Sequence, residues 1–362
     1  MTGGGTAGHI LPALEFLRVY RREFGAVGYF IGCAAGLESR LVPAHGERLE
    51  TIPGLPWARQ GLRGRLRAVT CLPAGVLAAR RILRREKTQL VIGAGGYAAF
   101  GACMAAYTLG LPVVIHEANA EPGLANRMAA RIATLVCVGF PETARRVRGT
   151  VEVTGVPTGA IGPSQPRDTP PWRFLVLGGS EGSPLLNRAA PELFAELRRR
   201  GLEFSVRHIC GFGDPAAIAR AYASADVVAE VDTFVDDMAA VYAGATLAIA
   251  SAGALTAAEL SAAAIPSFLV PLPGAANDHQ AANAAAYSAR TGAAVVPESQ
   301  WDAPRLAARI AGILADPREL QLLRQGAAQW DNTDAALRVV RACERILETR
   351  ALTLSQDPVA VK

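Results

Sequence analysis

The first residues of the chain combine glycines with a histidine, in the stretch 3–9 (GGGTAGH). The apolar residues that follow predict that this stretch is a turn leading into a helix. Backbone N–H groups at the start of a helix can bind a diphosphate. A histidine there favours the neutral imidazole, so His9 is a candidate base. The alternative is a helix-cap histidine that is bonded only to backbone.

The same stretch formally matches the dinucleotide-binding pattern GxGxxG at Gly3, Gly5 and Gly8. Such a site also needs a preceding strand and an acidic residue about 20 positions further on. No acid stands near residues 30–32, where the next strand should end, and the following one is Glu38. A nicotinamide or flavin site is therefore disfavoured, which leaves a diphosphate loop or a tight turn without a ligand.

Polar side chains also follow an apolar run in the middle of the first half. His116, Glu117 and Asn119 come directly after residues 112–115. Ligands of open α/β sheets bind at the carboxyl ends of the strands, so these side chains are candidates for ligand contacts. Ordinary loop polarity is the alternative.

Two groups in the second half have a comparable position. Glu259 lies one turn into a helix that is expected after residues 247–250, where a carboxylate could accept two ribose hydroxyls. Asp278 and Gln280 follow residues 268–273, where they could bind sugar hydroxyls. A plain helix-capping arrangement is the alternative for the first group.

Short apolar runs alternate with longer amphipathic runs, which predicts an α/β fold with parallel sheets. Residues 159–171, rich in Pro and Gly, are expected to be a linker, and the alternation resumes after them. We therefore expect two α/β units, each opening with a glycine-rich turn, and a last helix over residues 333–349. The expected strands are residues 27–31, 90–92, 112–115 and 135–138, and then residues 172–177, 205–210, 227–231, 247–250 and 267–270.

The position of the first turn has a consequence for the first sheet. Only Met1 and Thr2 stand before Gly3, so the strand that should carry the turn is missing. Loss of this central strand would expose the edges of its neighbours. We therefore expect about four to eight apolar residues upstream of Thr2 in the genomic sequence, a strand's length. An in-frame stop next to Met1 would refute this.

Composition and charge narrow the class of protein. The 362 residues are 51% hydrophobic and 19% charged, which favours a large core. Six scattered cysteines without a CxxC pair indicate reduced thiols and no metal site. Residues 1–150 carry 19 Lys and Arg against 9 Glu, whereas the rest carries 18 against 23 acidic residues. The basic half suggests an anionic partner: a phosphate-bearing ligand, nucleic acid or an anionic lipid surface.

The stretch 63–87 concentrates this positive charge. Its arginines lie beside an apolar stripe that includes Leu77, Ile82 and Leu83. Such a pattern is typical of a helix at a membrane surface, and an ordinary surface helix packed on a sheet is the alternative. The stretch contains no aromatic residue, so nucleic acid is a weaker choice.

Seven short stretches, in order and with similar spacing, resemble the MurG family of glycosyltransferases. This family adds N-acetylglucosamine to undecaprenyl-linked muramoyl-pentapeptide, the last cytosolic step of peptidoglycan precursor synthesis. The resemblance runs from Gly3 to about Leu347. It is carried by residues 3–14 (GGGTAGHILPAL), 93–102 (GAGGYAAFGA), 112–127 (PVVIHEANAEPGLANR), 177–187 (LGGSEGSPLLN), 234–238 (FVDDM), 253–260 (GALTAAEL) and 270–284 (VPLPGAANDHQAANA).

The resemblance implies a GT-B fold, with two Rossmann-like doubly wound domains facing across a cleft. Residues 1–158 would form the acceptor domain and residues 172–332 the UDP-N-acetylglucosamine domain, with the last helix packing back on the first. It also implies inverting transfer to the 4-hydroxyl of the lipid-linked sugar, without metal or cofactor. The enzyme would lie peripherally on the cytoplasmic face of the membrane. Its stretch 63–87 would contact anionic lipid, and nucleic acid would not be a partner.

The family's functional positions can be transferred to this sequence by its motifs. His9 would be the base for the acceptor hydroxyl, and Glu117 is a second catalytic candidate. Glu259 would accept the ribose hydroxyls, Val235 would offer its backbone to uracil, and Ser180 would help to hold the diphosphate. The substrate-binding positions are Thr6, Ala7, Gly8, Asn119, Ser180, Glu181, Gly182, Val235, Ala254, Leu255, Thr256, Ala257, Ala258, Glu259 and Gln280.

Four positions depart from the family pattern. Ser251 and Gly159 stand where many members have arginine, Gly274 replaces a frequent histidine, and Ala7 replaces a glycine. Each lost arginine would cost about 1.5–3 kcal/mol if it normally binds a diphosphate. Two alternatives therefore stay open: a non-catalytic or weakened paralogue that binds nucleotide-sugar, and a GT-B enzyme with a different lipid acceptor.

Overall fold

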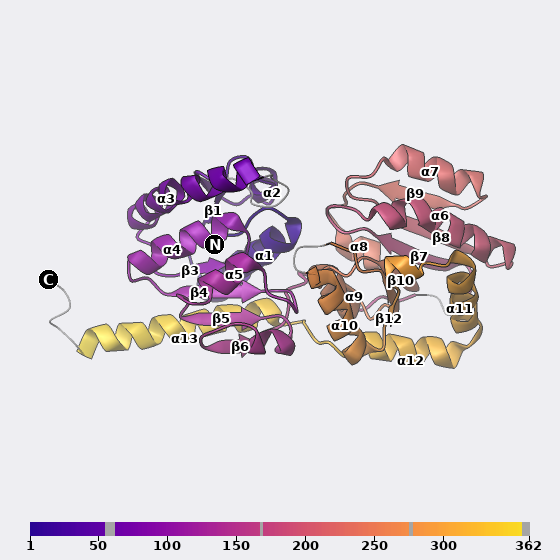
Figure 1. The fold of residues 1–362 in the computed structure, drawn as a ribbon. Helices are drawn as coiled ribbons and strands as arrows, with labels where there is room; N and C mark the ends of the chain where they lie inside the picture. Colours follow the sequence, from indigo (N-terminus) through magenta and orange to yellow (C-terminus); the bar gives the residue numbers. More distant parts are fainter. Residues whose placement is uncertain (55–61, 167–168, 275–277, 357–362) are drawn as a thin grey trace. The chain divides into compact units, whose positions relative to one another are not determined.

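The computed structural model describes residues 1–54, 62–166, 169–274 and 278–356, and side chains are described in these ranges except at residues 62–70, 354 and 356. The chain forms two compact units. Unit 1 comprises Met1–Pro157 and Asp334–Lys362, and unit 2 comprises Thr158–Thr333. Each unit contains parallel strands with helices on both faces (Figure 1). Among the described helices, none combines the length and the apolar composition that crossing a bilayer requires.

Unit 1 is built on parallel strands in the order β2-β1 and β3-β4-β5-β6. Met1 and Thr2 occupy the place between β1 and β3, since Thr2 forms parallel bridges with both Ile31 and Gly93. These two residues therefore hold the position at which a central strand was expected. The strands are β1 (Phe30–Cys33), β2 (Leu49–Ile52), β3 (Val91–Gly93), β4 (Val113–Glu117), β5 (Leu135–Val138) and β6 (Val151–Val153).

Two hydrophobic clusters cover the faces of this sheet. One joins α1 to α13, with Phe16 and Val339 in it, and the other joins α3 to α4, with Leu83 and Ala102. The last helix therefore packs on unit 1, although unit 2 precedes it in the sequence (Figure 1). The helices are α1 (Ala7–Phe24), α2 (Glu38–Ala44), α3 (Leu62–Arg85), α4 (Tyr97–Thr108), α5 (Leu124–Ala129), the 3-10 helix η1 (Pro141–Arg145) and α13 (Ala335–Gln356).

Unit 2 contains a six-stranded parallel sheet in the order β12-β11-β10-β7-β8-β9. The chain enters at β7, builds outward through β8 and β9, and then returns to the other side of β7 with β10. This is the doubly wound order of dinucleotide-type folds. The strands are β7 (Trp172–Leu177), β8 (Phe204–Ile209), β9 (Ala229–Asp232), β10 (Leu247–Ala250), β11 (Ser267–Leu269) and β12 (Ala294–Val295).

The core of unit 2 forms because its central strands are apolar on both faces. Phe174 and Val176 of β7 pack with Leu193 and Phe194 of α6 and with Ile310 of α11. The helices are α6 (Pro184–Arg199), α7 (Pro215–Ser224), α8 (Met238–Tyr242), α9 (Ala254–Ala262), α10 (His279–Thr291), the 3-10 helix η3 (Glu298–Gln300), α11 (Ala303–Ala315) and α12 (Pro317–Ala327).

Both sheets have a point at which successive strands depart to opposite sides. In unit 2 it lies between β7 and β10, and in unit 1 between Thr2 and β3. Loops that follow two such strands diverge and leave a crevice at the carboxyl edge, where α/β proteins bind their ligands. The glycine-rich loops of this chain follow these strands.

Candidate functional site

In unit 1 two glycine-rich segments, residues 3–8 and 93–96, lie against each other at the carboxyl edge of the sheet. The N–H of Gly4 donates to the carbonyl of Gly95 over 3.2 Å. A Cβ atom added at Gly96, whose φ is +86°, would collide with the carbonyl oxygen of Gly4. The second loop is therefore glycine because the first loop lies directly against it.

His9 lies in the first turn of α1, beside both segments. Its Nδ1 lies 3.0 Å from the carbonyl oxygen of Gly4 and 3.3 Å from Oγ1 of Thr6. A carbonyl can only accept, so the neutral ring carries its proton on Nδ1 and a lone pair on Nε2. A Cβ atom added at Gly95 would lie 3.0 Å from Nε2, so that nitrogen faces the second loop. His9 can therefore bond to the backbone through Nδ1 and still offer Nε2 as a base.

Glu117 ends β4 and is 2% exposed. Its Oε1 accepts from the backbone and side-chain amides of Asn119, at 2.9 and 3.0 Å. Its Oε2 accepts from the backbone of Gly123 and the side chain of Asn126, at 3.0 and 2.9 Å. These four donors use the acceptor sites of the carboxylate. The carboxylate thereby holds the loop after β4, and its expected catalytic role stays a prediction.

Asn126 was missed in the sequence because nothing marks one asparagine in a short helix. Besides Glu117, its amide binds the carbonyl of His116 at 3.1 Å and lies 3.4 Å from a Cβ atom added at Gly95. His116 itself points away into the core, where its Nε2 bonds to Gly155 and burial lowers the pKa of its imidazole. Of His116, Glu117 and Asn119, only Asn119 lies in the loop after β4, where it bonds to Glu117.

In unit 2 the loops after β7 and β10 meet in the same manner. A Cβ atom added at Gly179, whose φ is +76°, would lie 3.2 Å from Oγ of Ser251. Ser180 is half-buried in the first loop, Glu181 is exposed, and Gly182 is buried. The loop ends at Ser183, the N-cap of α6, whose Oγ accepts from the N–H of Leu186 at 3.3 Å.

Glu259 lies in α9, which begins at this same edge after the N-cap Gly253. Tyr242 donates to its Oε2 at 2.9 Å. Burial raises the pKa of the Glu259 carboxyl to about 7, against the lowering effect of the Tyr242 bond. The residues 254–258 that precede Glu259 form the first turn of α9, and Val235 is half-buried in the loop between β9 and α8.

Gln280 and Asn283 of α10 clamp the backbone that follows β10. Oε1 of Gln280 accepts from the N–H groups of Ala252 and Leu272, at 3.1 and 3.0 Å. Nδ2 of Asn283 donates to the carbonyl of Ala252 at 3.1 Å. The oxygen of Gln280 is thereby occupied, and its amide nitrogen is the end that can donate to a ligand. Asn283 was not predicted, although it lies three residues after Gln280 and therefore on the same face of the helix.

Within the described residues, no group of three or more His, Cys, Asp or Glu side chains could hold a metal ion. The predicted ligand positions of each unit thus gather at the carboxyl edge of its own sheet. Those of unit 1 follow Thr2 and β4, and those of unit 2 follow β7, β9, β10 and β11.

Residues 63–85 of the basic stretch lie in α3, and the side chains of Arg63, Arg65 and Arg67 lie outside the described residues. Ile82 and Leu83 are buried in the core below, so part of the apolar stripe packs on the protein.

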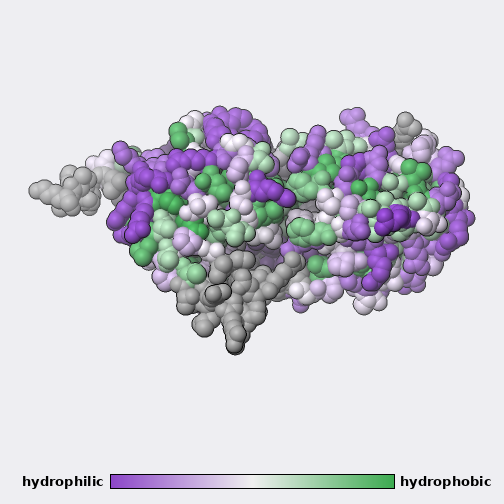
Figure 2. Space-filling model, turned by 90° about the horizontal axis from the view of Figure 1, so that it is seen from above, coloured by the Kyte–Doolittle hydropathy of each residue, from purple (hydrophilic) through white to green (hydrophobic). Residues whose placement is uncertain are grey.

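The outward face of α3 carries Arg81 and Arg84, both exposed, with Leu77 56% exposed beside them. Seen from above, hydrophilic residues gather over this part of unit 1, with smaller hydrophobic areas among them (Figure 2).

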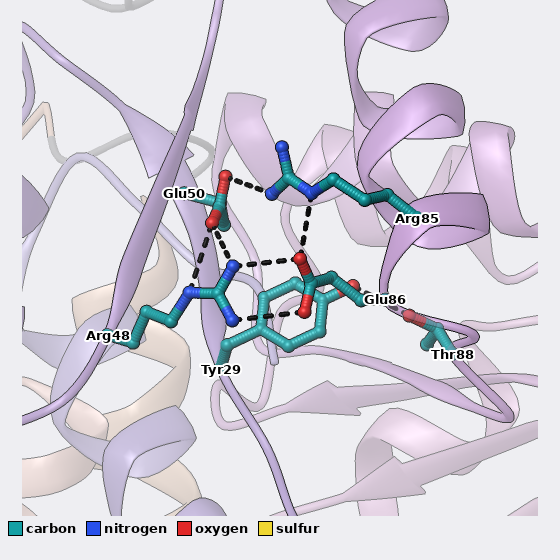
Figure 3. A network of polar contacts seen from close by, with 6 residues as sticks. All are labelled: Tyr29, Arg48, Glu50, Arg85, Glu86 and Thr88. Carbon is teal, nitrogen blue, oxygen red and sulfur yellow. Dashed lines mark hydrogen bonds and ion pairs between the residues drawn. The ribbon is translucent and has the colours of Figure 1, made fainter.

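The C-terminal end of α3 is tied to β2 by a network of ion pairs (Figure 3). Arg85 pairs with Glu50 at 2.7 Å and with Glu86 at 2.8 Å, and Arg48 pairs with the same two carboxylates. Arg48 lies over the ring of Tyr29, 5.7 Å from its centre. Arg48 and then Arg85 lower the pKa of Glu86 to about 2. Arg85 is therefore engaged within the fold, whereas Arg81 and Arg84 on the outward face form no ion pair with any residue that the structure describes.

Comparisons with known proteins agree with this architecture. The glycosyltransferase family 28 N-terminal domain matches residues 1–138, and the family 28 C-terminal domain matches residues 173–338. The crystal structure of Acinetobacter baumannii MurG superposes with a TM-score of 0.74 at 29% identity, covering 95% of this chain and 98% of that one. CalG4, the calicheamicin glycosyltransferase, shares the fold with a TM-score of 0.64 at 16% identity over 97% and 98% of the two chains.

Two relatives carry the name UDP-N-acetylglucosamine–N-acetylmuramyl-(pentapeptide) pyrophosphoryl-undecaprenol N-acetylglucosamine transferase. That of Alkalilimnicola ehrlichii is 39% identical over 94% of this chain and 96% of its own length. That of Ectopseudomonas mendocina is 40% identical over 95% and 97%. The chain therefore belongs to glycosyltransferase family 28 and, within it, to the MurG family of N-acetylglucosamine transferases.

Proposed function

We propose that the protein transfers N-acetylglucosamine from UDP-N-acetylglucosamine to the 4-hydroxyl of undecaprenyl-linked muramoyl-pentapeptide, as a step of peptidoglycan precursor synthesis. The observation that carries the proposal is the 39–40% identity, over nearly the whole chain, to transferases named for these two substrates. The carboxyl edges of the two sheets support it, because the residues at each edge include the groups that one of the substrates needs.

Unit 2 is proposed to bind the donor. Glu259 in its ionised form accepts the two ribose hydroxyls, and the backbone of Val235 pairs with uracil. Ser180 and the N–H groups of the loop before α6 hold the diphosphate, which the positive end of the helix dipole stabilises as it leaves. The Nε2 group of Gln280 donates to a hydroxyl of the sugar. Glu181, Gly182 and residues 254–258 complete this binding surface.

Unit 1 is proposed to bind the acceptor. The N–H groups of Thr6, Ala7 and Gly8 at the start of α1 face the diphosphate of the lipid carrier. Nε2 of His9 takes the proton from the 4-hydroxyl while that oxygen bonds to the anomeric carbon. The bond from this carbon to the diphosphate oxygen breaks, so UDP leaves and the configuration inverts. Asn119, held by Glu117, is proposed to bind the acceptor sugar.

Ser251 favours a second candidate, a non-catalytic or weakened paralogue that still binds the nucleotide-sugar. This side chain lies at Gly179, beside the proposed diphosphate site, and it is a neutral hydroxyl where many members have a guanidinium. A hydroxyl can donate one hydrogen bond but supplies no charge. Titration calorimetry with UDP-N-acetylglucosamine separates the candidates, since binding without turnover would favour a non-catalytic protein.

The outward face of α3 supports a peripheral position on the cytoplasmic face of the membrane. Arg81 and Arg84 present positive charge next to the exposed Leu77. Basic side chains beside apolar ones bind anionic lipid surfaces by charge and by shallow insertion. This position would bring the protein to an acceptor that is anchored in the bilayer.

The experiment that tests the proposal is a release assay on the purified full chain. UDP should appear only when UDP-N-acetylglucosamine and a lipid-linked muramoyl-pentapeptide analogue are both present. UDP release with another lipid-linked sugar, and not with this one, would favour a different acceptor. No release with any acceptor, from a protein that binds the donor, would overturn the enzymatic proposal.

A further inference from the structure

Glu38 is a buried carboxylate in unit 1 that the proposed reaction does not use. It is the first residue of α2 and is 1% exposed. A charged group in the interior costs free energy unless hydrogen bonds compensate it. The partners of Glu38 therefore indicate why a carboxylate stands there.

Its two oxygens bind two different segments of the chain. Oε1 accepts from the N–H of Cys33, at the end of β1, over 2.9 Å. Oε2 accepts from the N–H of Gly5, in the glycine-rich loop, over 3.3 Å. The carboxylate thus ties the loop that leads to His9 to the end of β1.

Three glycines leave the space that this side chain fills. A Cβ atom added at Gly4 would lie 2.8 Å from Oε1, and one at Gly32 would lie 2.6 Å from Cγ of Glu38. A Cβ atom at Gly36 would collide with Oε2. A phosphate-binding loop explains glycine at Gly4 but not at Gly32 or Gly36. All three positions are explained by a carboxylate that must reach the loop.

The hydrogen bond to Gly5 connects Glu38 to His9 through a single peptide group. The N–H of Gly5 and the carbonyl of Gly4 are the two ends of that group, and Nδ1 of His9 lies 3.0 Å from the carbonyl oxygen. Hydrogen bonds in series polarise one another, so a carboxylate on the N–H makes the carbonyl a stronger acceptor. A stronger acceptor keeps the proton on Nδ1 and the lone pair on Nε2.

We propose that Glu38 is a positioning residue that fixes the orientation and the tautomer of His9 through the Gly4–Gly5 peptide group. The inference rests on the proposed function, in which Nε2 of His9 receives the proton of the acceptor hydroxyl. The carboxylate of Glu38, the peptide group and the imidazole of His9 are hydrogen-bonded in series, and this series directs Nε2 toward the acceptor.

Three variants test this in the full chain. Glu38→Gln places an NH2 group against one of the two N–H donors and should lower kcat about 10- to 100-fold, the effect of losing one hydrogen bond to a charged group. Glu38→Asp keeps two acceptor oxygens and should retain more of the kcat than Glu38→Gln. Glu23→Gln, at an exposed ion pair of the same unit, should match the wild type. The Kd for UDP-N-acetylglucosamine should be unchanged in all three.

The His9→Ala background separates positioning from a structural role. If Glu38 acts through His9, Glu38→Gln should lower the residual activity of His9→Ala by less than about twofold. An equal loss in both backgrounds would contradict the proposal, because the carboxylate would then act without the histidine.

A readout that does not need activity is the NMR spectrum of the 15N-labelled histidine ring nitrogens. His9 should carry its proton on Nδ1 in the wild type and should become a mixture of tautomers in Glu38→Gln. A proton on Nε2 in the wild type, or an unchanged tautomer in the variant, would overturn the proposal. If Glu38→Gln does not fold, the wild type and Glu38→Asp decide by the same spectrum. A wild type without transferase activity would refute the proposed function and leave this spectrum as the test of the inference.

Discussion

Glu259 shows how one side chain can make donor binding depend on pH. Its carboxyl is buried next to Tyr242, and burial raises its pKa to about 7. A carboxylate can accept hydrogen bonds from two hydroxyls, whereas a neutral carboxylic acid uses one of its oxygens to donate its own proton. The ionised form is therefore the one that suits a ribose.

The affinity for UDP-N-acetylglucosamine should consequently rise with pH up to about 7 and then level off. Below that value the carboxyl must lose a proton to bind, so the affinity should fall by up to about tenfold per pH unit. Calorimetry from about pH 5.5 to about pH 8.5 measures this. Glu259→Gln should bind weakly with no such slope, and a flat profile in the wild type would contradict the assignment.

His9 is the second residue whose role can be isolated. Its Nδ1 is bonded to the backbone, and its Nε2 faces the loop 93–96. His9→Ala should lower kcat about 10²- to 10⁴-fold, the usual contribution of a general base, with the Kd for the donor unchanged. His45→Ala, at an exposed histidine of unit 1, is the control. Turnover within threefold of the wild type in His9→Ala would exclude a role as base.

At the scale of elements, the site of unit 1 depends on the contact between two loops. Gly96→Ala would drive a Cβ atom into the carbonyl of Gly4, whereas Gly46→Ala has a similar positive φ and open space around it. The comparison separates collision from backbone strain. Gly96→Ala should lower the free energy of unfolding by about 1–3 kcal/mol more than Gly46→Ala, as overpacking does.

Denaturant unfolding of the two variants checks this difference. Gly96→Ala should also lose turnover, because the Gly4 carbonyl that orients His9 must move. Equal stability of the two variants would show that the loops are not in the contact described for the wild type.

We predict that the outward face of α3 binds anionic membranes. Each basic residue near an anionic surface contributes about 1 kcal/mol, so reversing Arg81 and Arg84 to Glu should weaken binding to anionic vesicles about 30-fold or more. Arg198→Glu, on α6 of unit 2, is the control. Sedimentation with vesicles of phosphatidylglycerol and phosphatidylcholine measures both. Unchanged sedimentation of the Arg81 and Arg84 variant would place the membrane contact elsewhere.

The same scale shows what the sequence could predict. Leu135–Val138 forms a strand as expected, because a central strand is apolar on both faces. The edge strands β2, β6 and β12 were not expected, since their exposed positions interrupt the apolar run. The strand expected to begin at residue 27 begins at Phe30, and Val27 is fully exposed. An apolar run indicates burial only where neighbouring elements cover it.

The sequence likewise predicted only part of the candidate site. The glycine spacing predicted the loops after the strands, and these loops meet at the carboxyl edge of each sheet. The side chains that hold these loops could not be predicted, because Asn126, Asn283 and Tyr242 act across segments that are distant in sequence. The catalytic role expected for Glu117 stays a prediction, and the sequence did not indicate the four hydrogen bonds by which it holds its loop.

At the scale of the whole molecule, the chain uses one structural device twice. Each unit places a glycine-rich loop at the point where its parallel sheet reverses strand order, and each loop leads into a helix N-terminus. The basic first half suits the unit proposed to bind a lipid diphosphate and a membrane surface. The duplication fits a reaction in which both substrates carry a diphosphate.

The measurement that tests the central claim most directly is the structure of the reaction product. Wild-type protein incubated with UDP-N-acetylglucosamine and a lipid-linked muramoyl-pentapeptide analogue should yield UDP and one disaccharide. NMR of that product should show a β-linkage between the anomeric carbon of N-acetylglucosamine and oxygen 4 of the muramoyl sugar. An α-linkage, attachment at another oxygen, or donor hydrolysis without a disaccharide would contradict the proposed reaction.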